Sequence, residues 1–316
     1  GNLMKRRLFL TINLLLALSF SVPGAAQQLT FMTGPQGGVW VPLGGALKGM
    51  WEKAIPGLQV TAIPGAGIAN VRGVDEDKAQ IGIGNTITTV DGIAGRAPYP
   101  KKITKVCNIA SLYPQYFQVV VRTDAKINSI ADLKGKSIVV QPKGNTAEVV
   151  TQDMLVANGL NYSQLKVSFQ ASYTDAVDLV KDGHAHGMTL GTTVPSSAVM
   201  DLASARDIKL LPVTDEMLTA MRKTNRGYIK VTIPSNTYTK QEKPVDVIGY
   251  ATHIVVSCDL PEQTVYTMVK TMATNVTDMA AVNKAISGLT PKMMAEDIGV
   301  PFHSGATKYY KETKAM

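Results

Sequence analysis

Five times along this chain, a strand-like apolar run ends in a polar turn that contains glycine and leads into a helix-like stretch. This alternation predicts an α/β fold, because strands that alternate with helices pair largely in parallel. In an open α/β sheet such turns gather at the carboxyl ends of the strands, where ligands bind. The five turns span residues 33–38, 64–67, 84–86, 143–146 and 191–193.

Hydrophobic periodicity and capping residues place the elements around these turns. Strands are expected over residues 29–33, 59–63, 80–83, 137–141 and 166–169, and helices over 43–54, 68–77, 146–158 and 173–181. Two further apolar runs, at 116–122 and 253–257, are separated by a complete α/β unit. We interpret these runs as crossovers between two lobes. Lobe one is then formed by residues 27–117 and 240–316, and lobe two by residues 118–239.

The turns also indicate what the cleft between the lobes binds. Each turn leaves backbone N–H groups unpaired at a helix N-terminus, where the aligned peptide dipoles favour negative charge. Three turns fall in lobe one and two in lobe two, so the sequence predicts an anion site between the lobes. A nucleotide is not expected, because Gly65-x-Gly67-x-x-Asn70 lacks the third glycine and no phosphate-binding P-loop occurs.

The N-terminus is typical of a secretory signal peptide. Three basic residues, 5–7, precede the apolar run 8–20 and the small residues 23–26. The apolar run is shorter than the ~20 residues that span a membrane. We expect cleavage after Ala26 and a protein of the periplasm, the alternative being an uncleaved anchor. Residues 1–3, ahead of Met4, are interpreted as a cloning scar or an upstream start.

Charge argues against nucleic acid as a partner. The chain has 32 Lys and Arg against 24 Asp and Glu, a net charge of +8, which becomes 8 − 3 = +5 without residues 5–7. The remaining excess is scattered along the chain, whereas nucleic-acid binding requires a basic face. We therefore expect no nucleic-acid partner, and we expect a monomer.

The two cysteines and the histidines offer no metal site. Cys107 and Cys258 are the only cysteines, and export permits a disulfide between them. Two buried thiols are an equal alternative, since cysteine is often buried. Zinc would need histidine partners near them, whereas His184 and His186 lie in a turn-like stretch of their own. No metal and no cofactor are expected.

One short motif suggests catalysis. Ser163-Gln164-Leu165-Lys166 fits the S-x-x-K motif of penicillin-recognising hydrolases, but the companion motifs S-D-N and K-T-G are absent. We therefore expect no catalytic residue and no enzyme. A hydrolase based on Ser163 and Lys166 is kept as the less favoured alternative.

Six motifs spread over nearly the whole chain form a set. They span residues 33–45, 67–70, 131–136, 191–195, 232–238 and 301–312, and the last one is the most specific. In this set the chain resembles the TAXI family, the solute-binding proteins of tripartite ATP-independent periplasmic (TRAP) transporters.

The resemblance implies a two-lobed periplasmic binding protein fold of type II, with a ligand cleft between lobes joined by hinge strands. It implies a protein that captures glutamate, glutamine or a related dicarboxylate and delivers it to a TRAP membrane permease, without chemistry on the ligand. His303 would then have a structural role that ties the C-terminal tail to lobe one. An alternative role is presentation of the ligand to a periplasmic sensor.

Departures from the family pattern concern the ligand. Trp40 and Val41 stand where paired tyrosines are usual, and Ile68 replaces a serine whose hydroxyl could bind a carboxylate. The pair at 85–86 keeps the amide and hydroxyl of a common Gln-Ser, and His186 stands where an aspartate is usual. These changes predict a carboxylate more apolar or aromatic than glutamate.

The predicted ligand contacts are neutral donors and helix starts from the turns, together with one aromatic ring. Arg72 and Arg122 could act as charged clamps, but their places within a helix and at a strand end favour structural roles. The predicted ligand-binding residues are Gly38, Val39, Trp40, Asn70, Asn85, Thr86, Asn145, Thr146, Thr192 and Thr193.

Overall fold

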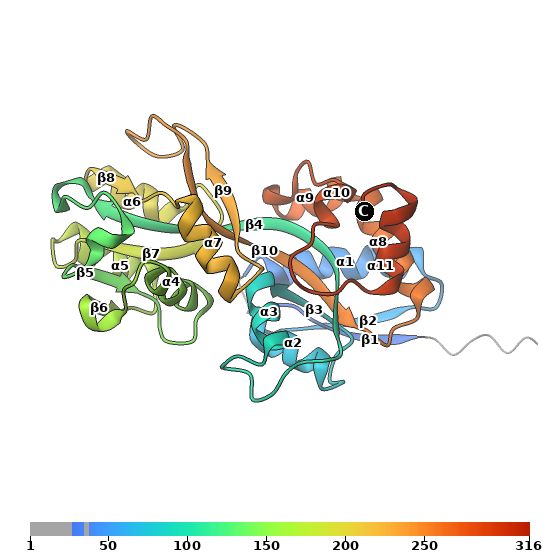
Figure 1. Ribbon diagram of the computed structural model, residues 1–316. Coiled ribbons are helices and arrows are strands. Elements are labelled where there is room, and N and C mark those ends of the chain that lie inside the picture. Colours follow the sequence, from blue (N-terminus) through green and yellow to red (C-terminus); the bar gives the residue numbers. More distant parts are fainter. Residues whose placement is uncertain (1–26, 35–37) are drawn as a thin grey trace, which may run out of the picture.

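One mixed sheet runs through the whole molecule (Figure 1). The computed structural model describes residues 27–34 and 38–316, so the predicted signal peptide, residues 1–26, lies outside the described residues. The ten strands follow the order β2-β1-β3-β10-β4-β7-β5-β6, with β8 paired to β4 and β9 paired to β10. Helices flank the sheet in both halves, which confirms the α/β class.

The strands are β1 (Gln28–Met32), β2 (Gln59–Ile63), β3 (Ile81–Asn85), β4 (Val106–Arg122), β5 (Ser137–Val140), β6 (Lys166–Phe169), β7 (Gly187–Thr192), β8 (Ile208–Leu210), β9 (Ile229–Ile233) and β10 (Val245–Ser257). The α-helices are α1 (Trp40–Ala54), α2 (Gly67–Asp75), α3 (Thr86–Ala94), α4 (Thr146–Ala157), α5 (Tyr173–Lys181), α6 (Ser197–Ala205), α7 (Asp215–Thr224), α8 (Glu262–Thr274), α9 (Val276–Val282), α10 (Pro291–Met294) and α11 (Ser304–Glu312). Short 3₁₀ helices are η1 (Thr123–Ala125), η2 (Ile130–Leu133), η3 (Tyr162–Gln164) and η4 (Lys284–Ile286).

The two long strands β4 and β10 connect the halves of the sheet. β1 pairs in parallel with β2 and β3 at one end, and β5 pairs in parallel with β6 and β7 at the other. Between them, β10 is antiparallel to both β3 and β4, and β4 is antiparallel to β7. The apolar runs predicted at 116–122 and 253–257 are parts of these two strands. The lobe boundaries at 117 and 239 stay predictions.

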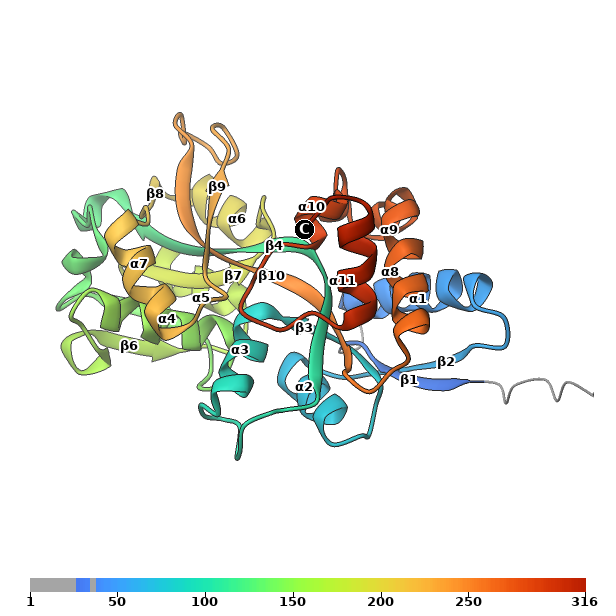
Figure 2. The ribbon, with the colours of Figure 1, turned by 45° about the vertical axis from the view of Figure 1, so that its right-hand side comes forward.

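Separate hydrophobic cores fill the two halves (Figures 1 and 2). In the right-hand half, α1 and α8 pack on β1, β3 and β10 around Trp51, which is fully buried and donates its Nε1–H to the carbonyl of Met268 at 3.2 Å. In the left-hand half, α4 and α7 cover one face of the sheet around Tyr228, and α5 and α6 cover the other around Val177.

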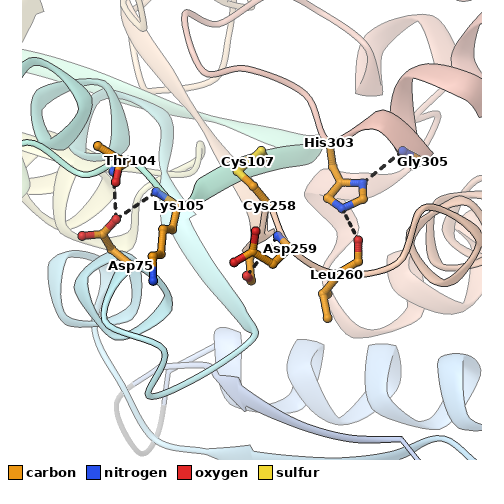
Figure 3. Close-up of a disulfide and its surroundings, with 10 residues drawn as sticks. Asp75, Thr104, Lys105, Cys107, Cys258, Asp259, Leu260, His303 and Gly305 are labelled. Carbon is orange, nitrogen blue, oxygen red and sulfur yellow. Dashed lines mark hydrogen bonds between the residues drawn. A yellow bond between two sulfur atoms is a disulfide. The ribbon is translucent and has the colours of Figure 1, made fainter.

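A disulfide and a histidine secure the right-hand half (Figure 3). Cys107 of β4 is bonded to Cys258, which directly follows β10. This resolves the two alternatives for the cysteines in favour of the bridge. His303 accepts the Gly305 N–H at Nδ1, 3.0 Å away, so the proton is on Nε2, which lies 2.8 Å from the Leu260 carbonyl. The predicted structural role of His303 is confirmed, since these bonds attach the start of α11 to the loop after β10.

Two features are absent from residues 27–34 and 38–316. Within these ranges, no helix is long and apolar enough to cross a membrane. The same residues contain no group of three or more His, Cys, Asp or Glu side chains that could hold a metal ion.

Candidate ligand-binding site

The register of the long strands brings the ends of β3 and β7 toward each other. Asn85, the last residue of β3, pairs with Thr252, which pairs with Tyr113 on β4. Thr192, the last residue of β7, pairs with Tyr116 on β4. Tyr113 and Tyr116 are three residues apart on β4, a distance of about 10 Å along a strand. The turns after β3 and β7 therefore face each other across a short stretch of β4.

That stretch of β4 is where the strand becomes accessible. All residues from Val106 to Tyr113 and from Phe117 to Val121 are buried, whereas Pro114, Gln115 and Tyr116 are half-buried. Gln115 Nε2 lies 3.4 Å from Thr252 Oγ1. We take this half-buried segment as the floor of the candidate cleft between the two sets of turns.

Three predicted turns meet on the right-hand side of the cleft. The Trp40 indole, on the first residue of α1, donates its Nε1–H to Tyr113 Oη at 3.0 Å. A Cβ atom placed on Gly67 would lie 3.6 Å from Asn85 Nδ2 and 3.9 Å from the Trp40 ring. The starts of α1, α2 and α3 thus lie close together, with Gly67 providing room between an aromatic ring and an amide.

The helices that start at four of the five predicted turns lack side-chain caps. The prediction of a helix directly after the fifth turn, 191–193, is wrong, because α6 begins only at Ser197. Asn is among the best N-cap residues, yet neither Asn85 before α3 nor Asn145 before α4 forms a capping hydrogen bond. The starts of α1 and α2, after Val39 and Ala66, are also uncapped. The helix N-termini and two amide side chains therefore retain donors for a ligand. By contrast, five helices that start elsewhere are capped, by Ser172, Ser196, Thr214, Thr290 and His303, although α8 and α9 are not.

Two predicted contact residues are fully buried and bond within the protein. Asn70 Nδ2 donates to the carbonyls of Thr33, at 2.7 Å, and Ile83, at 2.8 Å, and its Oδ1 accepts the Ala66 N–H at 3.1 Å. Thr86 Oγ1 accepts the Ala251 N–H at 3.1 Å. We assign these side chains a positioning role in place of direct ligand contact, since neither has exposed surface.

The other predicted residues have surface available. Asn145 and Val39 are exposed, and Gly38, Trp40, Asn85, Thr146, Thr192 and Thr193 are half-buried. Opposite Trp40, the Tyr173 hydroxyl lies 3.2 Å from both the N–H and the carbonyl oxygen of Gly191, which fixes the end of β7. Tyr173 and the floor residues Gln115 and Tyr116 were missed by the sequence prediction. The available signal was the sequence Pro114-Gln115-Tyr116 inside an otherwise apolar strand.

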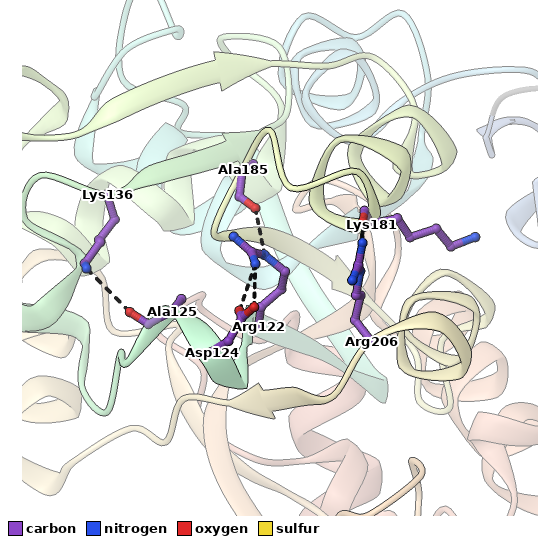
Figure 4. Close-up of polar contacts among 7 residues, drawn as sticks. All are labelled: Arg122, Asp124, Ala125, Lys136, Lys181, Ala185 and Arg206. Atoms are coloured by element: carbon purple, nitrogen blue, oxygen red, sulfur yellow. Dashed lines mark hydrogen bonds and ion pairs between the residues drawn. The ribbon is translucent and has the colours of Figure 1, made fainter.

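Of the two candidate clamps, Arg122 bonds within its own half (Figure 4). Arg122 Nη1 binds both carboxylate oxygens of Asp124, at 2.8 and 2.9 Å, and its Nε donates to the Ala185 carbonyl at 3.3 Å. Arg72 is 45% exposed and its nearest carboxylate, Glu76, is 3.8 Å away on the same helix. His186 accepts the Ser137 N–H at Nδ1, 2.9 Å away, and so joins β7 to β5.

The S-x-x-K motif lies on the surface. Ser163 is exposed in η3, and its hydroxyl and its N–H both donate to the Asn161 side chain, the cap of that helix. Lys166 is exposed on β6. The serine in this geometry stabilises a helix start, which gives no support to the hydrolase alternative.

A buried polar network joins the two halves beside α3. Asn225, in the loop between α7 and β9, donates from Nδ2 to the Ile87 carbonyl at 2.8 Å and to Asp91 Oδ1 at 2.9 Å. In the same loop, Tyr228 donates its hydroxyl to Asp153 Oδ2 at 2.5 Å, on α4. The network places carboxylates of α3 and α4 near each other.

We expect this network to make stability depend on pH. Burial raises the pKa of Asp91 from 3.8 to about 6, although the Arg96 guanidinium 3.0 Å away lowers it. The folded chain then binds more protons than the unfolded chain between about pH 4 and 6, so its stability rises as pH falls through this window. As pH falls through this window, the free energy of unfolding of the unmodified protein should rise by up to about 3 kcal/mol more than that of Asp91→Asn. Urea unfolding at pH 7 and pH 4 measures it, and equal pH dependence in both proteins would contradict the assignment.

Comparisons with known proteins agree on the fold. The sequence pattern of the NMT1-like family matches residues 31–313. A TctC solute binding protein from Polaromonas aligns with a TM-score of 0.57 and 16% identity, over 93% of this chain and 96% of that one. PhnD1 from Prochlorococcus marinus, in complex with methylphosphonate, gives a TM-score of 0.53 and 13% identity over 92% and 100% of the two chains. A protein from Xanthomonas citri bound to a chloride ion gives 0.51 and 10% over 91% and 96%.

Proposed function

This chain belongs to the NMT1-like family, and we propose that it is a periplasmic solute-binding protein that captures a small carboxylate between its two lobes. The aligned structures include a solute-binding protein, a methylphosphonate complex and a chloride complex. They support a binding role and an anionic ligand.

The uncapped helix starts are the observation that carries the carboxylate proposal. Asn85 and Asn145 stand at N-cap positions in opposite halves and leave both the helix N–H groups and their own amides without a capping bond. A carboxylate at a helix N-terminus is stabilised by these donors and by the helix dipole. Thr192 and Thr193 at the end of β7 add hydroxyl donors, so a ligand with two acidic or polar ends could bind both halves.

Trp40 supports a ligand with an apolar part. Its indole N–H is already bonded to Tyr113, so the ring offers the ligand mainly its apolar surface. The ring is half-buried, and a Cβ atom on the neighbouring Gly67 would lie 3.9 Å from it. An aromatic or branched aliphatic carboxylate would bury more of this ring than glutamate does, and burial of apolar area favours binding by about 25 cal/mol per Å².

The proposed partner is a TRAP membrane permease, and the proposed motion is closure about β4 and β10. Ligand contacts from both halves would favour the closed state, which the permease could recognise. Deleting the protein should abolish uptake of its ligand by cells. Retained uptake with loss of only a transcriptional response would favour the sensor alternative.

A thermal-shift screen tests the binding proposal. Protein unfolded and refolded to remove carried ligand is mixed with amino acids, dicarboxylates, keto acids and aromatic carboxylates. A ligand at about a hundred times its Kd adds ~2.7 kcal/mol to stability and raises Tm by roughly five degrees or more. Thr192→Val, which removes one predicted donor with little change in shape, should weaken the best ligand at least tenfold.

The matched control is Thr61→Val, an exposed threonine of β2 outside the cleft. It should leave ligand affinity unchanged. The proposed site is wrong if both threonine variants bind equally well. The carboxylate proposal fails if folded protein responds to no acid of the panel.

A further inference from the structure

A tyrosine hydroxyl on β10 is accessible and has no partner. Tyr250 is 3% exposed, and its hydroxyl forms no hydrogen bond with the residues that the structure describes. Two other tyrosine hydroxyls without a partner, those of Tyr99 and Tyr162, are fully enclosed by protein, whereas the Tyr250 oxygen is not. Burial, together with the nearby Tyr173, raises the pKa of Tyr250 above its ordinary value. The hydroxyl is therefore a neutral donor at neutral pH.

This hydroxyl points to the end of β7 and the start of α4. A Cβ atom placed on Gly191 would collide with the Tyr250 hydroxyl and would lie 3.4 Å from the Cβ atom of Ala147. Ala147 is the second residue of α4. Because Gly191 has no side chain, the tyrosine can approach the backbone of β7 closely. The hydroxyl and the first turn of α4 therefore meet beside Gly191.

The first turn of α4 supplies further donors. The N–H groups of Thr146, Ala147 and Glu148 have no acceptor among the described residues, and Asn145 forms no capping bond. The Glu148 carboxylate is engaged by Gln152 Nε2, at 2.9 and 2.6 Å. An anion at this helix start would be bound by N–H groups and a phenolic hydroxyl, and the helix dipole favours its negative charge.

Tyr250 is also next to the floor of the candidate cleft. It pairs with Gln115 on β4, and Thr252, two residues further along β10, pairs with Tyr113. The Tyr113 hydroxyl accepts the indole N–H of Trp40. Residues 250 and 252 share a face of β10 and are about 7 Å apart along the strand. A ligand that is bonded to the Tyr250 hydroxyl can therefore extend toward the Trp40 ring.

The donors around this hydroxyl are neutral. No charged group contributes to the raised pKa of Tyr250 or to that of Tyr173, whose pKa is also raised by burial. Burial of a charge without a cation beside it is unfavourable, and the cost grows with each further charge. The site thus favours an anion with a single negative charge.

We propose that the Tyr250 hydroxyl and the start of α4 bind the carboxylate of a ligand with a single acid group, whose apolar part lies against Trp40. This inference rests on the proposed carboxylate-binding function and adds the direction in which the ligand lies. Its acid group is bound by the left-hand half and its apolar part by the right-hand half. Tyr250 is then a specificity-determining residue for the acid group.

Calorimetric titration of the refolded protein with 3-phenylpropionate tests this orientation. Tyr250→Phe removes only a hydroxyl that has no protein partner, so it should retain the Tm and weaken binding of this acid about 10- to 100-fold. Tyr266→Phe is the matched control. It removes a hydroxyl that bonds to Glu312 on α11, outside the cleft, and should leave the affinity unchanged.

Trp40→Leu tests the other end of the acid. It should also weaken 3-phenylpropionate, because less apolar surface is buried. In the double variant with Tyr250→Phe the two fold-changes should multiply, since the two side chains contact opposite ends of the acid. A double variant that binds no more weakly than either single variant would overturn the orientation.

The other outcomes separate this inference from the proposed function. Equal affinity in the unmodified protein and in folded Tyr250→Phe would overturn the role of Tyr250, while the binding itself would still support a carboxylate site. An absence of saturable binding of 3-phenylpropionate would also overturn the inference. In that case a response to another acid of the thermal-shift screen would uphold the proposed function.

Discussion

Asn70→Ala is expected to lower the free energy of unfolding by about 3–6 kcal/mol and to abolish ligand binding. The side chain satisfies three backbone groups, directly after β1, in the middle of β3 and in the turn before α2. Alanine would leave these groups without their partner in a site that has no exposed surface, and each unsatisfied group costs about 1–3 kcal/mol. The same bonds hold together the turns that carry Trp40 and Asn85.

Urea unfolding and titration with the ligand found in the screen measure the two effects. Asn70→Asp keeps the acceptor for Ala66 but loses both Nδ2 donors, so it should also be impaired. The control is Asn128→Ala, an exposed asparagine whose change should stay within about 0.5 kcal/mol. Normal ligand affinity in a stably folded Asn70→Ala protein would refute the positioning role.

Loss of the Cys107–Cys258 disulfide is expected to destabilise the protein by about 2–5 kcal/mol. The two cysteines are 151 residues apart in sequence, so the bridge closes a long loop in the unfolded chain. In the chain-entropy model a 100-residue loop corresponds to about 4.7 kcal/mol, and native strain or residual structure reduces the measured value. Cys107→Ser/Cys258→Ser should therefore unfold roughly 5–10 °C lower than the oxidised protein.

Thermal unfolding with and without a thiol reductant measures the same effect in the unmodified protein. Reductant should lower the Tm of the unmodified protein toward that of the double variant and should leave the double variant unchanged. Ligand affinity should be retained in the double variant at a temperature where it is folded, since neither cysteine lies in the cleft. A Tm that does not respond to reductant, in protein shown to be reduced, would contradict the expected stabilisation.

Local patterns were sufficient to predict the class of fold and the turns. The glycine-containing turns before α2, α3 and α4 lie where periodicity placed them, because strand ends and helix caps depend on neighbouring residues. Residues 35–37 of the turn before α1 lie outside the described residues. The contact between Trp40 and Tyr113 and the floor at 114–116 could not be predicted in this way. They depend on the register of β10 between β3 and β4, which is set by pairings between residues more than a hundred positions apart.

Asn70 shows the limit of reading a site from residue type. An asparagine after a glycine turn suits both a ligand contact and a structural brace, and only burial separates the two roles. Cys107 and Cys258 show the same limit. Their apolar surroundings fitted two buried thiols as well as a bridge, until the pairing of β4 with β10 brought them together.

The position of β10 has a consequence for the order in which this protein can be built. β10 separates β3 from β4 in the sheet, although it is made more than 120 residues after β4. A ribosome that has released only the first two hundred residues has produced strands on both sides of a missing centre, with their apolar faces unpaired. Closure of the sheet must therefore wait for nearly the whole polypeptide, and pairings of this sequence separation form slowly. β4, β7, β5 and β6 pair with one another without β10, so the wait falls on the half that contains β1, β2 and β3. During that interval this half is open to chaperones and proteases, and fragments that end before residue 245 should leave it unfolded.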